Sequence, residues 1–211
     1  MTQSLRKPFS GLYVITDTQL MNQHTLATKV EQALKGGAQI VQFRDKVNNS
    51  QTKITLAKQL KTLCKIYQAW FIINDDIQLA KTVQADGVHI GKDDSDITSA
   101  RRALGKQAII GVSCYNDLER AQEMQELGAD YVAFGRFFAS KTKPNAPQAD
   151  ISTLTLAKKN LHIPVVAIGG ITQNNGHQLI EAGADSLAVI QGVFAHQDVE
   201  TQSQAIQELF N

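Results

Sequence analysis

Short apolar runs recur along the whole chain, separated by longer stretches that mix polar and apolar residues. Most of the runs are apolar at every position, which is typical of strands buried on both faces of a parallel sheet. Their shortness and their glycine boundaries favour strands over segments of buried helix. The runs predict eight strands, at 12–16, 39–43, 70–74, 87–90, 108–112, 131–135, 164–168 and 186–190.

The longer stretches carry apolar residues at spacings of three and four, so that each would bury one stripe of a helix. In the stretch 25–35, for example, Leu26, Val30, Ala33 and Leu34 fall on one face. This spacing predicts helices at 25–35, 52–67, 118–127, 177–182 and 199–210.

A short glycine motif closes three of the predicted helices just before a strand, at 36–39, 128–130 and 183–185. Glycine in this position supplies the left-handed conformation that ends a helix. Strands that alternate with helices imply right-handed βαβ units and a parallel sheet. Eight units predict closure into a single (β/α)8 barrel, a TIM barrel, with residues 1–211 as one domain. The alternative is an open doubly wound sheet, which usually carries GxGxxG after its first strand; no such motif follows 12–16.

Composition and charge narrow the class of protein. The chain has 211 residues, of which 43% are hydrophobic, and its 21 Lys and Arg nearly balance its 20 Asp and Glu. No net field therefore favours nucleic acid or a membrane surface. The polar start of the chain lacks the apolar core of a signal peptide, and a cytoplasmic protein is expected. Cys64 and Cys114 have neither CxxC spacing nor a His partner, which predicts ordinary reduced thiols.

Candidate chemistry follows from the barrel prediction, because (β/α)8 barrels carry their active sites at the C-terminal ends of the strands. Gln42, Arg44 and Lys46 alternate at the end of the second strand, and alternation places their side chains on one face. Two cations there suit a diphosphate, although such a row is also typical of a solvated edge.

Acidic residues follow the third and fourth strands, where Asp75 and Asp94 favour a Mg²⁺ site. An aspartate after a strand can instead cap the next helix. His89 stands alone, without a second His at helical spacing, which favours a hydrogen-bonded core histidine and argues against zinc. Ser113, after the fifth strand, is either a helix cap or a substrate contact.

Glycines at the ends of the last two strands, Gly169, Gly170 and Gly192, predict a phosphate site, because barrels commonly bind phosphate there through backbone N–H groups. The loop after the sixth strand, through Pro147, is rich in hydroxyls and cations and is either a substrate lid or a solvated surface loop. The two predicted anion sites indicate a transfer between two phosphorylated small molecules, without naming them.

Several of these strand ends together resemble the thiamine phosphate synthase family over nearly the whole chain. The matching segments are 42–46, 73–75, 87–91 with Asp94, 111–113, Thr142-Lys143 and 167–171. The resemblance implies a Mg²⁺-assisted transferase that joins an aminopyrimidine diphosphate to a thiazole phosphate, or to its carboxylated form, with loss of pyrophosphate. It also implies small-molecule substrates, with homo-oligomerisation left open.

The same resemblance implies roles for individual residues. Arg44, Lys46, Ser113 and Lys143 would be catalytic, and Asp75 and Asp94 would bind Mg²⁺. The pyrimidine diphosphate would contact Gln42, Phe43, Arg44, Asp45, Lys46, Asn74, Ser113 and Lys143. The thiazole phosphate would contact Ser140, Lys141, Thr142, Gly170, Ile190 and Gln191.

The chain departs from the family pattern at a few positions, and rival functions remain open. Lys92, Arg136, Ala139, Ser140 and Gln191 stand where the family usually has other residues. One rival is a thiazole tautomerase, which would not need the diphosphate-binding metal site. Others are a non-catalytic barrel that binds thiamine intermediates and regulates a partner, and an indole-type or phosphoribosyl-anthranilate barrel.

Overall fold

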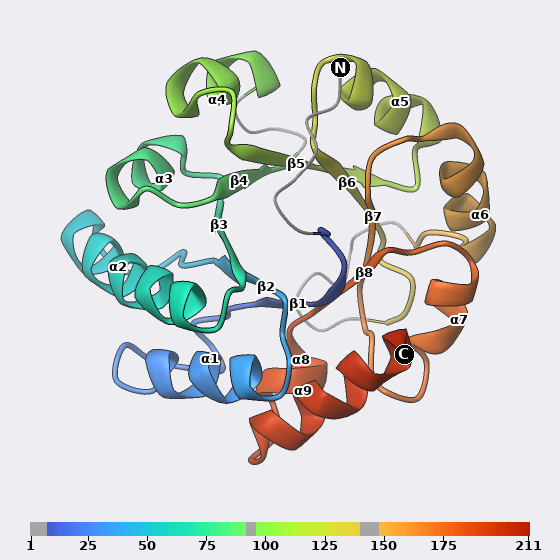
Figure 1. The fold of residues 1–211 in the computed structure, drawn as a ribbon. Helices are drawn as coiled ribbons and strands as arrows, with labels where there is room; N and C mark the ends of the chain where they lie inside the picture. The colour runs from blue at the N-terminus through green and yellow to red at the C-terminus, as the bar shows by residue number, and fades with distance from the viewer. Residues whose placement is uncertain (1–7, 92–95, 140–147) are drawn as a thin grey trace.

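The eight strands form one closed barrel in which every neighbouring pair is parallel. The structure is a computed structural model that describes residues 8–91, 96–139 and 148–211. The strands follow one another round the ring in chain order, and β1 pairs with β8 to close it (Figure 1). Closure confirms the predicted (β/α)8 barrel and excludes the open sheet.

The strands lie close to their predicted positions. They are β1 (Gly11–Ile15), β2 (Ile40–Phe43), β3 (Trp70–Asn74), β4 (Gly87–Ile90), β5 (Ile109–Tyr115), β6 (Tyr131–Phe134), β7 (Val165–Ile168) and β8 (Ser186–Val189).

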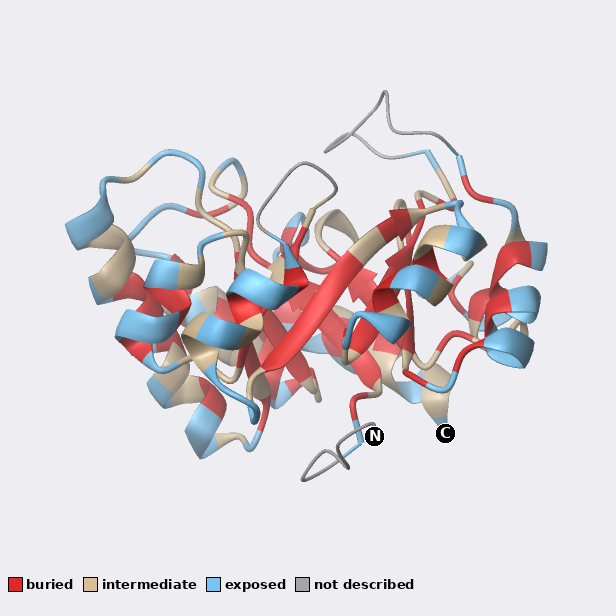
Figure 2. Ribbon diagram, turned by 90° about the horizontal axis from the view of Figure 1, so that it is seen from above, coloured by how far each residue is buried: buried red, intermediate tan, exposed pale blue. Residues whose placement is uncertain are grey.

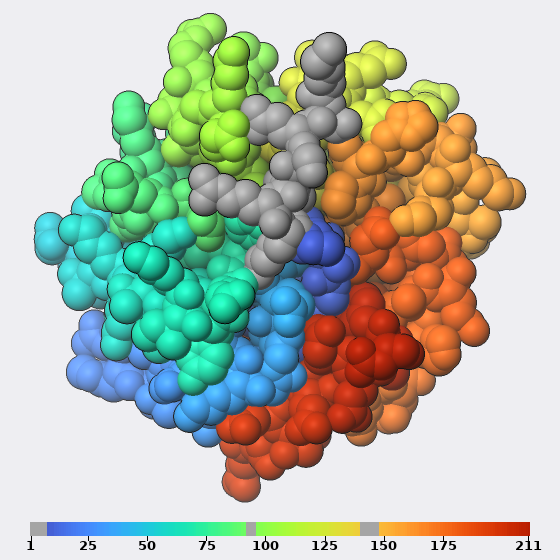
Figure 3. Space-filling model, in the orientation of Figure 1, coloured from blue at the N-terminus to red at the C-terminus, as the bar shows by residue number. Residues whose placement is uncertain are grey.

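The helices surround the barrel, and α9 packs beside α1 where the colours of the two chain ends meet (Figure 3). The five predicted helices are present as α1 (Leu26–Lys35), α2 (Ser50–Ile66), α5 (Leu118–Glu126), α7 (His177–Glu181) and α9 (Val199–Gln207), the last followed by the 3-10 turn η1 (Glu208–Phe210). Eight strand–helix units were predicted, but no residue ranges were assigned to four further helices: α3 (Ile77–Val83), α4 (Ile97–Leu104), α6 (Ile151–Asn160) and α8 (Gln191–Phe194).

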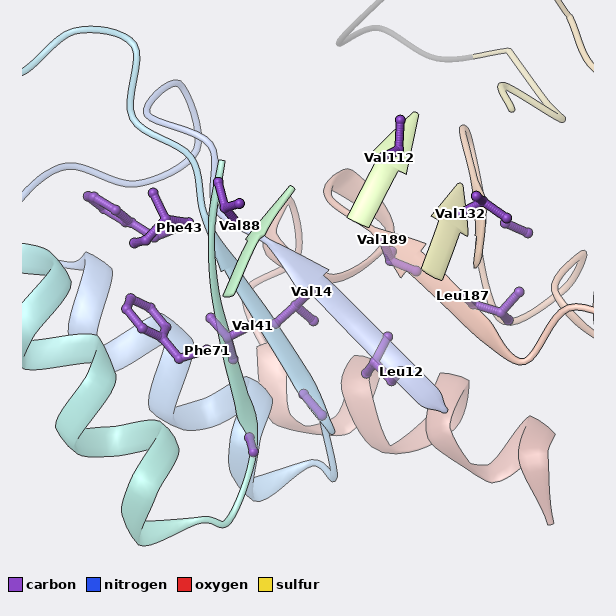
Figure 4. Packing of buried hydrophobic residues seen from close by; sticks show 14 of the residues in the cluster. Leu12, Val14, Val41, Phe43, Phe71, Val88, Val112, Val132, Leu187 and Val189 are labelled. Atoms are coloured by element: carbon purple, nitrogen blue, oxygen red, sulfur yellow. The ribbon is translucent and has the colours of Figure 1, made fainter. Parts of the chain in front are cut away.

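The strands separate two hydrophobic cores. The larger lies between the strands and the helices and receives the outward side chains of each strand, such as Leu12, Val41 and Val88 (Figure 4). The smaller fills the barrel itself and contains the inward side chains, such as Tyr13 and Ile40. Buried residues accordingly cover the strands and the inner faces of the helices, while exposed residues lie on the outer helix faces (Figure 2). This alternation determines which strand-end side chains can reach the barrel mouth.

The repeated glycine motif ends helices as predicted, because Gly37, Gly128 and Gly183 all have left-handed backbones, with φ of 95°, 94° and 115°. The aspartate of the motif has a second role. Asp130 Oδ2 accepts the backbone N–H of Ile110 at 2.8 Å and a bond from Arg101 at 2.6 Å. The bonds tie the start of one strand to its neighbour and to an outer helix.

Asp185 and Asp86 make the same tie. Asp185 accepts from Val165 N at 2.9 Å and from Lys158 at 2.7 Å. Asp86 accepts from Phe71 N at 2.8 Å and from Lys61 at 2.6 Å. The Asp86 copy was missed in the sequence because Gln84, with φ of 53°, takes the place of glycine.

The structure also bears on the state of the two cysteines and on whether a helix could cross a membrane. Cys64 and Cys114 are buried and not joined in a disulfide, and burial raises the pKa of the Cys114 thiol to about 12. Of the helices in the described ranges, none has the length and apolar character required to cross a bilayer.

Candidate active site

A cavity of about 300 Å³ opens at the C-terminal ends of the strands. Side chains from all eight strands line it, among them Ile15, Asn74, Ser113 and Ile168. Its volume is at the lower end of the range for small-molecule sites, about 300–1,000 Å³. The cavity is therefore the barrel mouth, where enzymes of this fold carry out their chemistry.

The cationic row lies on one side of the mouth. Gln42 and Arg44 both line the cavity, as their alternation predicts. The Arg44 backbone is held by Thr16, whose Oγ1 accepts from Arg44 N at 2.9 Å and donates to Arg44 O at 3.1 Å. Lys46 continues the row, and its Nζ lies 2.6 Å from Asp75 Oδ2. A diphosphate entering here would meet a guanidinium and an ammonium group.

The two aspartates after β3 have different roles. Asp76 caps α3 by accepting from Leu79 N at 2.8 Å. Asp75 is the residue before this cap, and its backbone is left-handed, with φ of 62°. Its Oδ2 instead accepts from Lys46 and from Asn74 Nδ2, both at 2.6 Å. The helix-cap alternative therefore applies to Asp76, and Asp75 lies beside the cationic row.

Phe43 and Asp45 lie within the predicted row, but the structure does not bring their side chains to the mouth. Alternation turns Phe43 outward, into the core between strands and helices, where it is buried. The Asp45 carboxylate folds back onto its own loop and accepts from Asn48 N and Val47 N, each at 3.0 Å. Burial alone would raise the pKa of Asp45, but these bonds and one from the Asn48 side chain lower it.

Glycine turns form the other side of the mouth. Gly170, Ile190, Gln191 and Gly192 line the cavity, and α8 begins at Gln191, directly after β8. A Cβ on Gly170 would lie 2.4 Å from Ala139 O, and one on Gly192 would lie 2.3 Å from Ile171 O. These contacts require glycine, because neighbouring backbone would have to move for any side chain. The first turn of a helix presents N–H groups suited to a phosphate.

Ser113 is part of a hydrogen-bonded chain that crosses the barrel beneath the mouth. Its Oγ lies 2.9 Å from His89 Nε2, and His89 Nδ1 lies 2.9 Å from Tyr131 Oη. Tyr131 Oη lies 2.9 Å from Tyr13 Oη, which accepts from Gln42 Nε2 at 2.7 Å. Asp117 caps α5 instead, so the helix-cap reading of Ser113 is wrong.

The sequence did not lead us to predict Tyr13 or Tyr131 as site residues, and it predicted His89 only as a hydrogen-bonded core residue. Both ring nitrogens of His89 do have partners. The signal that could have found the tyrosines is alternation, because each lies two residues before another inward-facing residue, Ile15 and Ala133.

Five predicted site residues, together with Lys92, lie outside the described residues: Asp94, Ser140, Lys141, Thr142 and Lys143. Within the described ranges, no three His, Cys, Asp or Glu side chains gather as a metal site. Of the predicted Mg²⁺ ligands, the structure therefore places Asp75 alone.

The closed barrel, with a cavity at the C-terminal ends of its strands lined by Arg44 and by glycine turns, has the architecture of a (β/α)8-barrel enzyme. The family model for thiamine monophosphate synthase matches residues 12–193. The chain therefore belongs to this family, the thiamine-phosphate synthases, which are transferases of thiamine biosynthesis.

Individual members of this family are similar to the chain over nearly its whole length. The thiamine-phosphate synthase of Nitrosococcus oceani is 50% identical over 210 residues, covering 100% of this chain and 95% of the relative. That of Methylobacillus flagellatus is 46% identical and covers 100% of both chains. Among solved structures, thiamine phosphate pyrophosphorylase from Pyrococcus furiosus superposes with a TM-score of 0.87 at 34% identity, covering 94% of each chain. The predicted family is confirmed.

Proposed function

We propose that the chain joins an aminopyrimidine diphosphate to a thiazole phosphate, or to its carboxylated form, giving thiamine phosphate and pyrophosphate, with carbon dioxide as a further product from the carboxylated form. The observation that supports this most strongly is that Gln42 and Arg44 line the same cavity as the turns at Gly170 and Gln191. The Lys46–Asp75 pair lies at the ends of the adjoining strands β2 and β3. A reaction between two phosphorylated molecules needs an anion site for each, and the cationic side chains and the glycine turns of this mouth are suited to these two roles.

Charge on the departing diphosphate is stabilised by the cationic side. The bond between the pyrimidine's exocyclic methylene carbon and the diphosphate oxygen breaks, and its electron pair leaves with pyrophosphate. The ring amino group delocalises the positive charge left on the methylene carbon. Arg44 and Lys46 would stabilise the developing negative charge, and Lys143, outside the described residues, would add a third cation.

Asp75 would hold Mg²⁺ together with Asp94, and one or two carboxylates plus substrate phosphates are the usual ligand set of this ion. Asp75 fits this role, because its carboxylate lies beside the cationic row at the mouth. When bound, Mg²⁺ would neutralise charge on the diphosphate. Lys46 and Asn74 hold the Asp75 carboxylate in place through its Oδ2.

The thiazole phosphate would lie in the glycine turns, against the backbone of Gly170, Ile190 and Gln191, with Ser140, Lys141 and Thr142 as further contacts. Its ring nitrogen then attacks the methylene carbon with its lone pair, and the new C–N bond completes thiamine phosphate. The thiazole nitrogen is itself the nucleophile, so no protein nucleophile or strong base is required. Positioning and electrostatics supply the rate enhancement.

Pyrophosphate release by the purified chain tests this function. The reaction contains the aminopyrimidine diphosphate, thiazole phosphate and Mg²⁺, with parallel reactions that omit each component or add EDTA. We expect release only in the complete mixture. A protein that binds either substrate in calorimetry without releasing pyrophosphate would indicate a tautomerase or a regulatory barrel instead.

Three broader expectations stay predictions. They are that residues 1–211 form one domain, that the protein works in the cytoplasm, and that its ligands are small molecules, with homo-oligomerisation left open.

A further inference from the structure

The hydrogen-bonded chain beneath the mouth joins residues from five different strands. It runs in the order Gln42, Tyr13, Tyr131, His89 and Ser113, from β2, β1, β6, β4 and β5. Its two end members, Gln42 and Ser113, are residues expected to contact the pyrimidine, and both line the cavity together with parts of Tyr13 and His89. The three middle members have no role in the reaction as proposed so far.

One arrangement of hydrogens along these bonds leaves Ser113 with a hydrogen to donate to a ligand, and it begins at the Gln42 amide. Gln42 Nε2 can only donate, so Tyr13 Oη accepts from it. In this arrangement Tyr13 gives its hydroxyl hydrogen to Tyr131, and Tyr131 gives its own to His89 Nδ1. His89 Nδ1 is then an acceptor, so the ring proton of neutral His89 lies on Nε2 and is donated to Ser113 Oγ.

The tyrosines keep their hydrogens, because burial raises the pKa of both Tyr13 and Tyr131 far above its ordinary value. Packing also fixes their places. Phe9 stacks on the Tyr131 ring at 4.3 Å between centroids, and His89 stacks on the same ring at 5.5 Å. A Cβ on Gly111 would lie 1.9 Å from Tyr131 Cζ, so β5 has a glycine where the tyrosine ring crosses it.

Both ends of the chain keep bonding capacity for a ligand. No described residue bonds Gln42 Oε1, and no described buried side-chain N or O atom lacks a partner, so this oxygen is accessible. Ser113 Oγ accepts from His89, which leaves its own hydrogen to donate. The cavity therefore presents an acceptor at Gln42 and a donor at Ser113.

We propose that Tyr13, Tyr131 and His89 are positioning residues that fix this acceptor–donor pair and so select an aminopyrimidine over its oxo form. The inference rests on the proposed function. The exocyclic amine donates to Gln42 Oε1, and a ring nitrogen accepts from Ser113. In the oxo form, the carbonyl oxygen of the ligand would face Gln42 Oε1. Two acceptors would then lie together without a donor between them, which weakens binding.

Binding of the aminopyrimidine diphosphate and of its 4-oxo analogue, each without thiazole phosphate, tests the selection. Tyr131→Phe keeps the stacked ring but removes the hydroxyl link. We expect it to lower the ratio of the two affinities by about tenfold, the effect of one hydrogen bond, mainly by weakening the amino form. In turnover, KM for the pyrimidine should rise more than kcat falls.

Two substitutions at His89 separate hydrogen bonding from packing. His89→Gln keeps one acceptor and one donor and should restore part of the selectivity that His89→Leu loses. Tyr67→Phe is the matched control, because Tyr67 Oη bonds Glu31 on the outer helices, and it should leave both affinities unchanged. If the Tyr131 and His89 variants weaken both ligands equally, these residues only pack the barrel and the proposal fails.

The unsubstituted protein offers a test that no folding defect can obscure. Nitrogen NMR of labelled histidine, with the His89 signal assigned by its absence in His89→Gln, should show the ring proton on Nε2. A proton on Nδ1 would mean that His89 donates to Tyr131 and accepts from Ser113, which is the opposite direction, and it would overturn the proposal. Absence of thiamine phosphate formation by the unsubstituted chain would instead refute the underlying function, so the two failures are distinguishable.

Discussion

Lys46 and Asp75 meet across the ends of β2 and β3, with Lys46 Nζ 2.6 Å from Asp75 Oδ2. The pair joins the cationic row to the carboxylate that would hold Mg²⁺, and Asn74 bonds the same oxygen from the neighbouring position. The Lys46 side chain is 56% exposed, so the pair adds little to stability. The position of the Lys46–Asp75 pair is therefore better explained by a role in substrate and metal binding than by a contribution to stability.

Asp75→Asn should impair the reaction without unfolding the protein. We expect a loss of about 100-fold in kcat/KM and a higher Mg²⁺ concentration for half-maximal rate, because the substitution removes a charged metal ligand. A Mg²⁺ titration of the initial rate measures both. Asp76→Asn is the matched control, since asparagine also caps helices, and should behave as the unsubstituted protein. Equal Mg²⁺ dependence in the two variants would contradict a metal role for Asp75.

Arg44→Met should weaken the pyrimidine diphosphate site. Charge-assisted hydrogen bonds contribute about 1.5–3 kcal/mol, so kcat/KM for the pyrimidine substrate should fall by about 100-fold. Arg44→Lys should keep only part of the unsubstituted protein's kcat/KM, because lysine cannot make the forked contacts of a guanidinium group. Steady-state kinetics with each substrate varied in turn measures this. Lys58→Met, at an exposed position on α2, is the charge-loss control, and an equal loss there would refute the assignment.

Gly170→Ala should affect the thiazole phosphate. The new Cβ would lie 2.4 Å from Ala139 O, and the turn would have to shift. KM for the thiazole phosphate should rise by about tenfold or more, while KM for the pyrimidine changes little. Gly105→Ala is a matched control, because Gly105 also has positive φ, of 87°, but open space around it. A Gly170 variant with normal thiazole kinetics would remove this turn from the phosphate site.

Asp130→Ala should lower stability without altering the mouth. Asp130 ties Ile110 N and Arg101 together, and its side chain is 16% exposed. Loss of these bonds should reduce the free energy of unfolding by about 1–3 kcal/mol, measured by urea denaturation. Glu126→Ala, on the exposed face of α5, serves as the control. An Asp130 variant as stable as this control would show that the tie contributes nothing.

Much of the fold could be predicted because buried parallel strands have a recognisable composition, and the glycine that ends α1, α5 and α7 has a backbone requirement. The ranges of α4 and α6 were not predicted because their buried faces have few large apolar residues: α4 buries Ile97 and Ala100, and α6 buries Leu154 with Thr153 and Ala157. Helix α3 has only seven residues. Helix α8 has four residues and no periodicity to detect. The equivalent motif at Asp86 was not recognised in the sequence, because Gln84 adopts the left-handed conformation where the other copies have glycine.

The site was predictable where a strand's alternation decides it. Gln42 and Arg44 reach the mouth for this reason, and the same rule, applied to the intervening positions, turns Phe43 into the outer core. The chain from Gln42 to Ser113 could not be predicted in this way. Its members come from five strands that meet only when the barrel closes, and no local pattern links Tyr13 to Tyr131.

Thiamine phosphate formation by the purified full chain tests the assigned reaction most directly. Thiamine phosphate and pyrophosphate are quantified in the same mixture of aminopyrimidine diphosphate, thiazole phosphate and Mg²⁺. We expect both products in equal amounts, and a strongly reduced yield of both with Arg44→Met. Absence of thiamine phosphate in a preparation that binds both substrates would contradict the assigned reaction.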